Sequence, residues 1–242
     1  MPTVRIWYAF QHRNSHILHA LHDACLLSLE EKLRCERYRF QGDKELFLLS
    51  HALLRLTLSM QTSVAPPDWR FKRSAHGKPA IVQPAEYQHL RFNLSHTRGL
   101  AACAISDKYD IGIDTEFSKR PFSALPIAER FFAPAEIAYL EARSPEKLCD
   151  AFFDIWTLKE AYIKACGSGL FAEPLQDFSM EIVETGDIHI RIKKASSDPA
   201  GEWQFCRFRP DPDYRMALAI HRPGYADVLP EIGEADLRLA LW

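Results

Sequence analysis

The sequence lacks the features that mark membrane-spanning and secreted chains. None of its apolar runs approaches the length of about 20 residues that a helix needs to cross a bilayer. Its N-terminus also lacks the signal-peptide order of charged, apolar and small residues. We therefore expect a cytoplasmic protein with no membrane partner. Its 242 residues, 47% apolar and 26% charged, suit a globular chain of one large domain or two small ones.

Paired cysteines and glycine-rich catalytic loops are missing as well. The six cysteines are scattered and form no C-x-x-C pair, so we expect reduced thiols rather than a zinc site or a disulfide framework. No G-x-S-x-G segment is present, which argues against a serine hydrolase of that type. The segment Gly77-Lys78 has no upstream glycine and precedes a proline, so it is not a P-loop.

Charge is distributed unevenly along the chain. Residues 1–110 contain 15 Lys and Arg against 10 Asp and Glu, whereas residues 111–242 contain 15 against 22. A basic half suits phosphate binding and an acidic half suits a metal ion. Two solvated faces of opposite sign would produce the same counts, so both interpretations stay open at this point.

The first half of the chain shows one strand, then helices, then a series of strands. Ser28 and Glu31 have the spacing of a capping box, which predicts a helix from there to about Arg39. Asp43 is expected to cap a second, leucine-rich helix that runs to Met60. Strands are predicted at 4–10, 69–71, 80–82, 90–94 and 100–105, the last two forming a hairpin around residues 95–99.

The second half repeats this order. After a strand at 111–116, a short helix is expected at 134–142, and a long one follows Ser144 and ends near Cys166 because Gly167 is a helix terminator. The remaining strands are predicted at 178–183, 188–192, 203–208 and 216–220. We therefore predict an α+β fold with an internal duplication. Residues after about Gly224 read as a tail or a terminal helix.

Two carboxylates stand at the end of the strand Ile111-Gly112-Ile113-Asp114-Thr115-Glu116. Side chains at i and i+2 of a strand share a face, so Asp114 and Glu116 converge on one spot. Their mutual repulsion requires a neutralising cation, proton or basic side chain, and oxygen ligands suit a hard ion such as Mg²⁺. An isolated D-x-E is also common by chance at a solvated strand end.

The long second helix carries Glu160 and Lys164, which are neighbours on one helix face. The simplest interpretation is a surface ion pair that contributes little stability. Because the helix is strongly apolar around Trp156, these charges could instead border a buried cleft. Glu160 would then be a third carboxylate beside Asp114 and Glu116.

Ser95 and His96 are expected in the turn of the first hairpin. A loop serine, a histidine and the nearby Lys78 are suited to binding an anion such as phosphate. A Ser-His hydrolase that uses Asp114 is a weaker alternative, because adjacent residues rarely act as nucleophile and base. A separate histidine series has helical spacing and is interpreted as a polar helix face or loop rather than a metal site. It comprises His12, His16, His19 and His22.

Taken together, five segments resemble the 4′-phosphopantetheinyl transferases, and in particular the larger, monomeric (surfactin-synthetase-activating) type. The resemblance spans about residues 28–220 in the family's order. The segments are Gly77-Lys78-Pro79, Phe92-Asn93-Leu94-Ser95-His96, Ile111 to Glu116, Arg130-Phe131-Phe132 and Trp156 to Gly169. The resemblance implies a pseudo-dimer of two similar α+β subdomains with the active site between them. The expected parts are residues 1–110, residues 111–224 and a C-terminal tail of residues 225–242.

The resemblance also implies the activity. Such enzymes transfer the 4′-phosphopantetheine moiety of coenzyme A to a serine of an apo acyl- or peptidyl-carrier protein and release adenosine 3′,5′-bisphosphate. The expected partner is a carrier protein or domain of a fatty-acid, polyketide or nonribosomal-peptide synthase. No nucleic-acid partner is expected, and the enzyme is expected to be a monomer. A non-catalytic homologue that only binds coenzyme A or the carrier is the alternative.

The site residues follow from the same resemblance. Asp114, Glu116 and Glu160 would bind Mg²⁺, and Glu160 and Lys164 would take part in catalysis. Either Glu160 or a water on the metal would accept the proton of the carrier serine, and the sequence leaves this choice open. The helix from Asp43 departs from many relatives in having Leu46 and His51 where they have arginines, which leaves the adenine and 3′-phosphate contacts open. The expected coenzyme A phosphate contacts are Arg34, Lys78, Ser95, His96 and Lys164.

Overall fold

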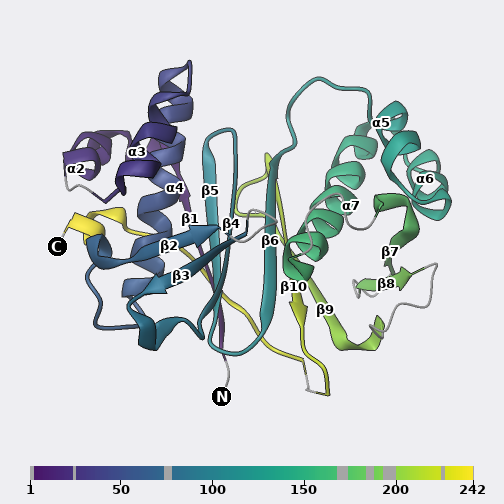
Figure 1. Cartoon of the computed structure of the whole chain (residues 1–242). Helices are drawn as coiled ribbons and strands as arrows, with labels where there is room; N and C mark the ends of the chain where they lie inside the picture. Colours follow the sequence, from purple (N-terminus) through teal and green to yellow (C-terminus); the bar gives the residue numbers. More distant parts are fainter. Residues whose placement is uncertain are drawn as a thin grey trace. The chain divides into compact units, whose positions relative to one another are not determined.

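The computed structural model of the chain describes residues 3–23, 26–73, 78–167, 174–183, 188–192, 200–224 and 227–241. The chain divides into two compact units, which we call unit 1 (Met1–Lys108 with Leu229–Trp242) and unit 2 (Tyr109–Val228). Both units combine helices with sheets, which confirms the α+β class (Figure 1). Among the residues described, no helix is long and apolar enough to cross a membrane.

A four-stranded sheet forms the centre of unit 1, in the order β11-β1-β5-β4. The hairpin between β4 and β5 reverses at Gly99, whose φ of 76° suits a glycine in a tight turn. Because β4 extends as far as Thr97, the prediction that Ser95 and His96 lie in the turn was wrong. The strands are β1 (Val4–Phe10), β4 (Arg91–Thr97), β5 (Leu100–Ser106) and β11 (Glu231–Glu234).

The helices of unit 1 begin with three short segments, α1 (Gln11–Asn14), η1 (Ser15–Ile17) and α2 (Leu18–Asp23). The predicted capping box of α3 (Leu29–Glu36) is present, with the Ser28 and Glu31 side chains each bonded to the other's backbone N–H. Because α1, η1 and α2 are separate segments, the four histidines do not share one continuous helix. They are His12, His16, His19 and His22. All four are exposed, as expected for polar surface residues.

Helix α4 (Gln41–Ser59) buries a leucine-rich face against β5. It begins two residues before Asp43, which lies in its first turn, so Asp43 is not the cap that the sequence predicted. Phe40 holds the N-cap position without a side-chain cap. Two short 3₁₀ segments, η2 (Pro66–Asp68) and η3 (Ala85–Tyr87), flank a separate hairpin of β2 (Arg70–Arg73) and β3 (Pro79–Gln83).

A three-stranded sheet in the order β6-β10-β9 organises unit 2, and the long helix α7 packs against β6 and β10 (Figure 1). Gly167 ends α7 in the left-handed conformation with φ 71°, as predicted. Helix α5 (Ala124–Phe131) is an element that the sequence analysis did not predict. The other elements are β6 (Asp110–Phe117), α6 (Pro134–Glu141), α7 (Pro145–Cys166), η4 (Leu175–Asp177), β7 (Phe178–Ile182), β8 (Ile188–Ile192), η5 (Ala200–Glu202), β9 (Trp203–Phe208) and β10 (Tyr214–His221).

The two units share one strand order. In unit 1 the first strand, β1, pairs antiparallel with the last strand of a hairpin, β5, and β5 pairs with β4. In unit 2 the first strand, β6, pairs in the same way with β10, and β10 pairs with β9. Each unit also has a small two-stranded sheet, β2-β3 or β7-β8. This common order supports the duplication inferred from the sequence.

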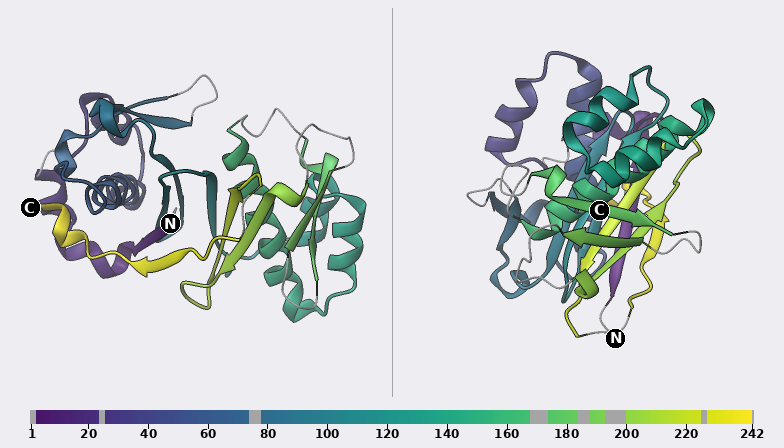
Figure 2. Two further views of the ribbon diagram at one scale, coloured as in Figure 1. Left: turned by 90° about the horizontal axis from the view of Figure 1, so that it is seen from below. Right: turned by 90° about the vertical axis from the view of Figure 1, so that its right-hand side faces the viewer.

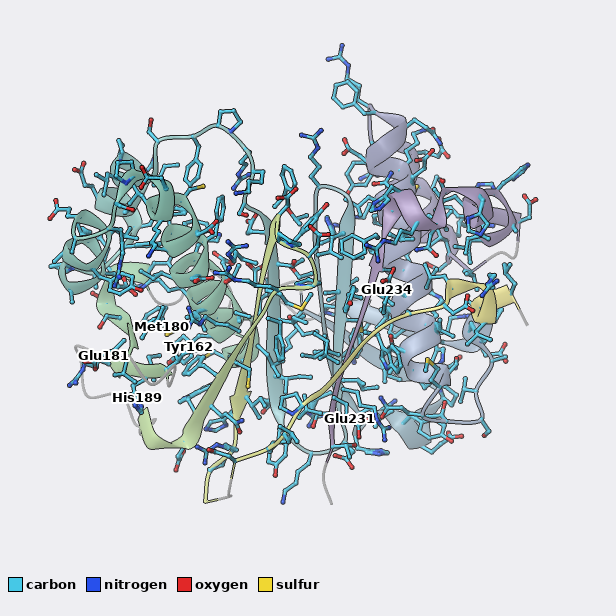
Figure 3. The ribbon with its side chains drawn as sticks, turned by 180° about the vertical axis from the view of Figure 1, so that it is seen from behind. Tyr162, Met180, Glu181, His189, Glu231 and Glu234 are labelled. Atoms are coloured by element: carbon cyan, nitrogen blue, oxygen red, sulfur yellow. The ribbon has the colours of Figure 1, made fainter. Side chains whose placement is uncertain are left out.

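The C-terminal segment returns to unit 1. Strand β11 pairs in parallel with β1, side by side in Figure 2, and Glu231 and Glu234, labelled in Figure 3, form ion pairs with Arg5 and Arg13. Strand β11 is followed by η6 (Leu237–Leu241), which buries Leu237 in the core of unit 1. Of the two expectations for the residues after about Gly224, a tail or a terminal helix, the helix is wrong for residues 231–234, because their backbone pairs with strand β1.

Candidate functional site

Strand β6 directs three residues of the predicted motif toward helix α7. Gly112 is the first of them, and a Cβ at this position would lie 2.1 Å from the carbonyl oxygen of Ala161 and 2.4 Å from the amide nitrogen of Ala165. The backbone of α7 therefore passes directly over Gly112. Asp114 and Glu116 lie on the same face of the strand as Gly112 because side chains alternate along it.

The neighbouring strand β10 contributes small side chains beneath the same helix. Ala219 lies opposite Gly112 and Ala217 lies opposite Asp114, and both alanines are fully buried. Small residues on both strands allow the helix to approach the sheet closely. This close approach brings α7 over the strand that carries the acidic pair.

Lys164 of α7 forms an ion pair with Asp114. Its Nζ lies 2.6 Å from Asp114 Oδ1 and also donates a hydrogen bond of 3.2 Å to the carbonyl oxygen of Ile113. The Asp114 side chain is 8% exposed and that of Lys164 is 28% exposed. The acid is therefore nearly enclosed, while the lysine retains access to solvent.

Glu160 lies one helical turn before Lys164 and is buried. Burial is the main cause that raises its pKa to about 7, and the negative charges of Asp114 and Glu116 add to the effect while Lys164 opposes it. The three carboxylates thus interact electrostatically within unit 2. Glu116 also has a basic neighbour, since Arg120 Nη2 lies 3.7 Å from Glu116 Oε2.

The structure brings together Asp114, Glu116, Glu160 and Lys164, all of which the sequence analysis had selected. Within the described part of the chain, no group of three or more His, Cys, Asp and Glu side chains is placed so that it could hold a metal ion. The acidic cluster is oxygen-only and electrostatically strained, so it can take up a proton or a cation. Mg²⁺ is usually held by one or two carboxylates together with waters and substrate phosphates, and a closed cage is not required.

A buried ion pair on the other side of α7 was not found from the sequence. Lys159 Nζ lies 2.8 Å from both carboxylate oxygens of Glu136, and both side chains are 1% exposed. The only local signals were a lysine inside an apolar helix and a glutamate two residues after Pro134. Neither signal reveals the partner, because the two residues are 23 positions apart.

Unit 1 contains a cavity of about 290 Å³ with a basic lining. His96 faces it together with Leu94, since the two alternate residues share a face of β4. From the sequence, Arg34 and His96 were expected to contact phosphate, whereas the other basic groups of this lining were not assigned to a site. The basic residues that line the cavity are Arg34, His51, Arg55, Arg70, Lys72 and His96.

Glu31 neutralises part of this basic lining. Its carboxylate lies 2.7 Å from Arg55 Nη2 and 2.9 Å from His51 Nδ1, and it also accepts a hydrogen bond from the Ser28 backbone. Burial alone would raise the pKa of Glu31, but the His51 hydrogen bond and the Arg55 charge outweigh it, so the pKa is lowered well below its usual range. Arg55, which is fully buried, depends on this carboxylate for charge compensation.

Ser95 and Lys78 have different positions from His96. Ser95 is buried and its neighbour His96 is exposed, so the two side chains lie on opposite faces of β4. Opposite faces exclude a direct nucleophile–base pair between them and contradict the Ser-His hydrolase alternative. Lys78 is half-buried and directly precedes Pro79, which lines the cavity.

Two family models match consecutive parts of the chain. The model described as "4'-phosphopantetheinyl transferase, N-terminal" covers residues 11–108. The model described as "4'-phosphopantetheinyl transferase superfamily" covers residues 110–219 and includes the acidic motif of β6 and the whole of α7. The boundary between the two matches coincides with the boundary between units 1 and 2 near residue 109.

Individual relatives match over most of their length. The chain is 31% identical over 211 residues to 4′-phosphopantetheinyl transferase Sfp of Bacillus subtilis (strain 168), covering 87% of this chain and 89% of Sfp. It is 31% identical to 4′-phosphopantetheinyl transferase HetI of a Nostoc species, covering 81% of this chain and 79% of HetI. The human L-aminoadipate-semialdehyde dehydrogenase-phosphopantetheinyl transferase is 26% identical over 80% of this chain and 67% of its own.

Proposed function

The chain belongs to the 4′-phosphopantetheinyl transferase superfamily, and on that basis we propose that it transfers the 4′-phosphopantetheine moiety of coenzyme A to a serine of an apo carrier protein. The serine oxygen forms a bond to the phosphorus that bears pantetheine. The bond from that phosphorus to the bridging oxygen breaks, and adenosine 3′,5′-bisphosphate leaves. The arrangement of Asp114, Glu116, Glu160 and Lys164 is the observation that carries this proposal.

We further propose that Asp114, Glu116 and Glu160 hold Mg²⁺. The fit rests on the oxygen-only donor set and on the burial of Glu160 near the negative charges of Asp114 and Glu116, which together raise its pKa to about 7. When bound, Mg²⁺ neutralises charge on the pyrophosphate and polarises its phosphorus–oxygen bonds. Lys164 holds Asp114 Oδ1 in place and adds a positive charge on the solvent side of the cluster.

Glu160 and a water on the metal are the two candidates for the general base, and we propose Glu160 because it is buried and interacts with Asp114 and Glu116. Its pKa of about 7 belongs to the metal-free cluster, and bound Mg²⁺ would lower it. The proton would pass from the carrier serine to Glu160 as the oxygen attacks. In phosphoryl transfer such positioning and charge neutralisation dominate catalysis, so no covalent enzyme intermediate is needed.

For coenzyme A we propose phosphate contacts from the basic groups of unit 1. His96 and Arg34 line one cavity, and this supports the assignment that their sequence motifs suggested. The resemblance adds Lys78, Ser95 and Lys164 to the proposed phosphate contacts, although Ser95 lies on the face of β4 opposite to His96 and does not line this cavity. The acceptor would be an acyl- or peptidyl-carrier protein or domain of a fatty-acid, polyketide or nonribosomal-peptide synthase, and the enzyme would act as a monomer.

The decisive experiment is modification of a panel of apo carrier proteins with coenzyme A and MgCl₂. We expect the mass of at least one carrier to increase by one phosphopantetheine group, and we expect chelation of Mg²⁺ to stop the reaction. Asp114→Ala should lower the rate by at least about 10²-fold while the protein stays folded, because a group that neutralises transition-state charge is lost. Tight binding of coenzyme A without any carrier modification would contradict the proposed activity.

A further inference from the structure

The buried ion pair of Lys159 and Glu136 lies next to the proposed metal ligand in sequence but has no part in the chemistry. Lys159 immediately precedes Glu160 on α7, and successive residues point about 100° apart around a helix. One side chain therefore faces α6 and β7 while the other interacts with the acidic pair of β6. Met180 and Tyr162, labelled in Figure 3, belong to the hydrophobic cluster between α7 and β7.

The hydrogen bonds of this pair are complete. Lys159 Nζ donates to both oxygens of Glu136 at 2.8 Å and to the carbonyl oxygen of Phe178 at 2.6 Å, which uses all three of its protons. Glu136 also accepts hydrogen bonds from the backbone N–H groups of Ala133 and Met180, both at 2.8 Å. One ion pair thus joins α7 to the start of α6 and to β7.

Aromatic rings close the remaining surroundings of the ammonium group. Nζ lies 4.2 Å from the ring centroid of Phe178 and 5.7 Å from that of Phe132. Such rings attract a cation and exclude water. The group is therefore held in one position by three hydrogen bonds and two rings, and α7 has little freedom to rotate at residue 159.

A buried ion pair is a poor device for stability. The desolvation of two charges offsets most of their attraction, and apolar side chains of similar size often serve as well or better. A directional network does, however, specify one arrangement of the elements that it joins. On the opposite side of α7, the contact of Gly112 with the backbone at Ala161 and Ala165 limits the same helix.

We propose that Lys159 and Glu136 are positioning residues that fix the rotation of α7 and so hold Glu160 at the correct place against Asp114 and Glu116. This inference rests on the proposed role of Glu160 in binding Mg²⁺. Mg²⁺ requires near-octahedral geometry at about 2.0–2.1 Å, so a small rotation of α7 weakens its binding. Residues that orient metal ligands typically affect metal affinity by about 10–100-fold.

The test uses two variants and a control for stability. Lys159→Met removes one charge and leaves Glu136 buried without its partner, which can prevent folding. The double variant Glu136→Gln/Lys159→Met removes both charges and preserves the volume of both side chains. Leu140→Ala is the matched control, because it shortens a fully buried side chain of α6 and lowers stability while both charges of the ion pair stay in place.

Two readouts are measured on the full chain. The first is the Mg²⁺ concentration that produces half of the rise in thermal midpoint in the presence of coenzyme A. It reports metal binding without turnover. The second is the Mg²⁺ concentration that supports half-maximal transfer to a carrier. We expect the double variant to raise both Mg²⁺ concentrations by at least about tenfold, whereas Leu140→Ala should change them by less than about twofold.

A further experiment distinguishes a positioning role of the ion pair from a general loss of stability. We then add the double substitution to a protein that already carries Glu160→Gln. There it should change the Mg²⁺ concentration at half of the thermal shift by less than about twofold, because the carboxylate that the ion pair positions is already absent. An unchanged Mg²⁺ requirement in the double variant, or an effect of full size in the Glu160→Gln background, would overturn the inference alone. A wild-type protein that shows neither transfer nor a Mg²⁺-dependent shift would overturn the proposed function and this inference together.

Discussion

Glu160 is surrounded by one basic and two acidic side chains, and this environment sets its protonation state. The pKa of about 7 arises first from burial and then from the charges of Asp114 and Glu116. Lys164 lowers the pKa but does not cancel these effects, since its own ion pair is with Asp114. At neutral pH the metal-free cluster therefore exchanges a proton readily.

A pH dependence follows from this value. An unfolded chain binds the Glu160 proton with a pKa of about 4.3, so between about pH 4.5 and 7 the folded state holds more protons than the unfolded state. The stability of the metal-free protein should therefore fall as pH rises through this window. Glu160→Gln should flatten this part of the profile, measured by urea unfolding at several pH values. Parallel profiles for the two proteins would show that Glu160 does not titrate as described.

Mg²⁺ binding should have the opposite trend with pH. Because the cation must displace the proton from Glu160, its apparent affinity should rise by up to about tenfold per pH unit below pH 7 and level off above it. Calorimetric titration of Mg²⁺ in the presence of coenzyme A measures this directly. The same titration with Glu160→Gln should show weak binding with little pH dependence. An affinity of the wild type that is constant from pH 5.5 to 7 would contradict the assignment.

At the scale of elements, the contact between α7 and β6 determines the geometry of the acidic cluster. Gly112 has no side chain to collide with this helix. A Cβ at this position would lie 2.1–3.0 Å from backbone atoms of Ala161, Lys164 and Ala165. Backbone atoms in the middle of a helix cannot move aside as a flexible side chain can. The glycine of the acidic motif is thus part of the reason that its carboxylates lie close to Glu160.

Gly112→Ala should therefore reduce stability and transfer together. We expect a loss of about 1–3 kcal/mol or more in the free energy of unfolding, since the helix must shift to admit the methyl group. Gly42→Ala is the matched control, because the nearest atom to its new Cβ is the Gln11 side chain at 3.9 Å and the site lies in α4. That control should be neutral or gain about 0.4–1 kcal/mol. Equal effects of the two substitutions in urea unfolding would refute the steric argument.

At the scale of the whole molecule, unit 1 is completed by the end of the chain. Strand β11 covers the edge of β1, and Leu237 in η6 is fully buried among the residues of the unit 1 core. The ion pairs of Glu231 and Glu234 with arginines are exposed and add little. Residues 1–108 alone would expose an open strand edge and an apolar surface, so unit 1 depends on chain synthesised after unit 2.

Two leucines of η6 provide a direct test of this dependence. Leu237 is 0% exposed and Leu239 is 52% exposed, although only two positions separate them. Leu237→Ala should reduce the free energy of unfolding by about 2–5 kcal/mol. Leu239→Ala should change it by less than about 0.5 kcal/mol. Similar urea midpoints for the two variants would show that the C-terminal segment does not support unit 1.

Features with a local physical cause could be predicted from the sequence. The capping box at Ser28 and the end of α7 at Gly167 were predicted correctly, since both depend on residues within one helical turn. The strand around Asp114 was also predicted within one residue at either end. The turn near Ser95 was misplaced because Gly99, rather than the polar residues before it, determines where the hairpin reverses.

The α+β class, the duplicated order of elements, the family and the side chains of the proposed chemistry could all be predicted from the sequence. This was possible because alternation, helix caps and short motifs are properties of neighbouring residues. The folded chain was needed to show which charged side chains are buried and which residues they contact. The pKa of Glu160, the pairing of Lys159 with Glu136 and the strand at residues 231–234 all depend on residues far along the chain. Burial and long-range pairing follow from packing, and no local pattern encodes them.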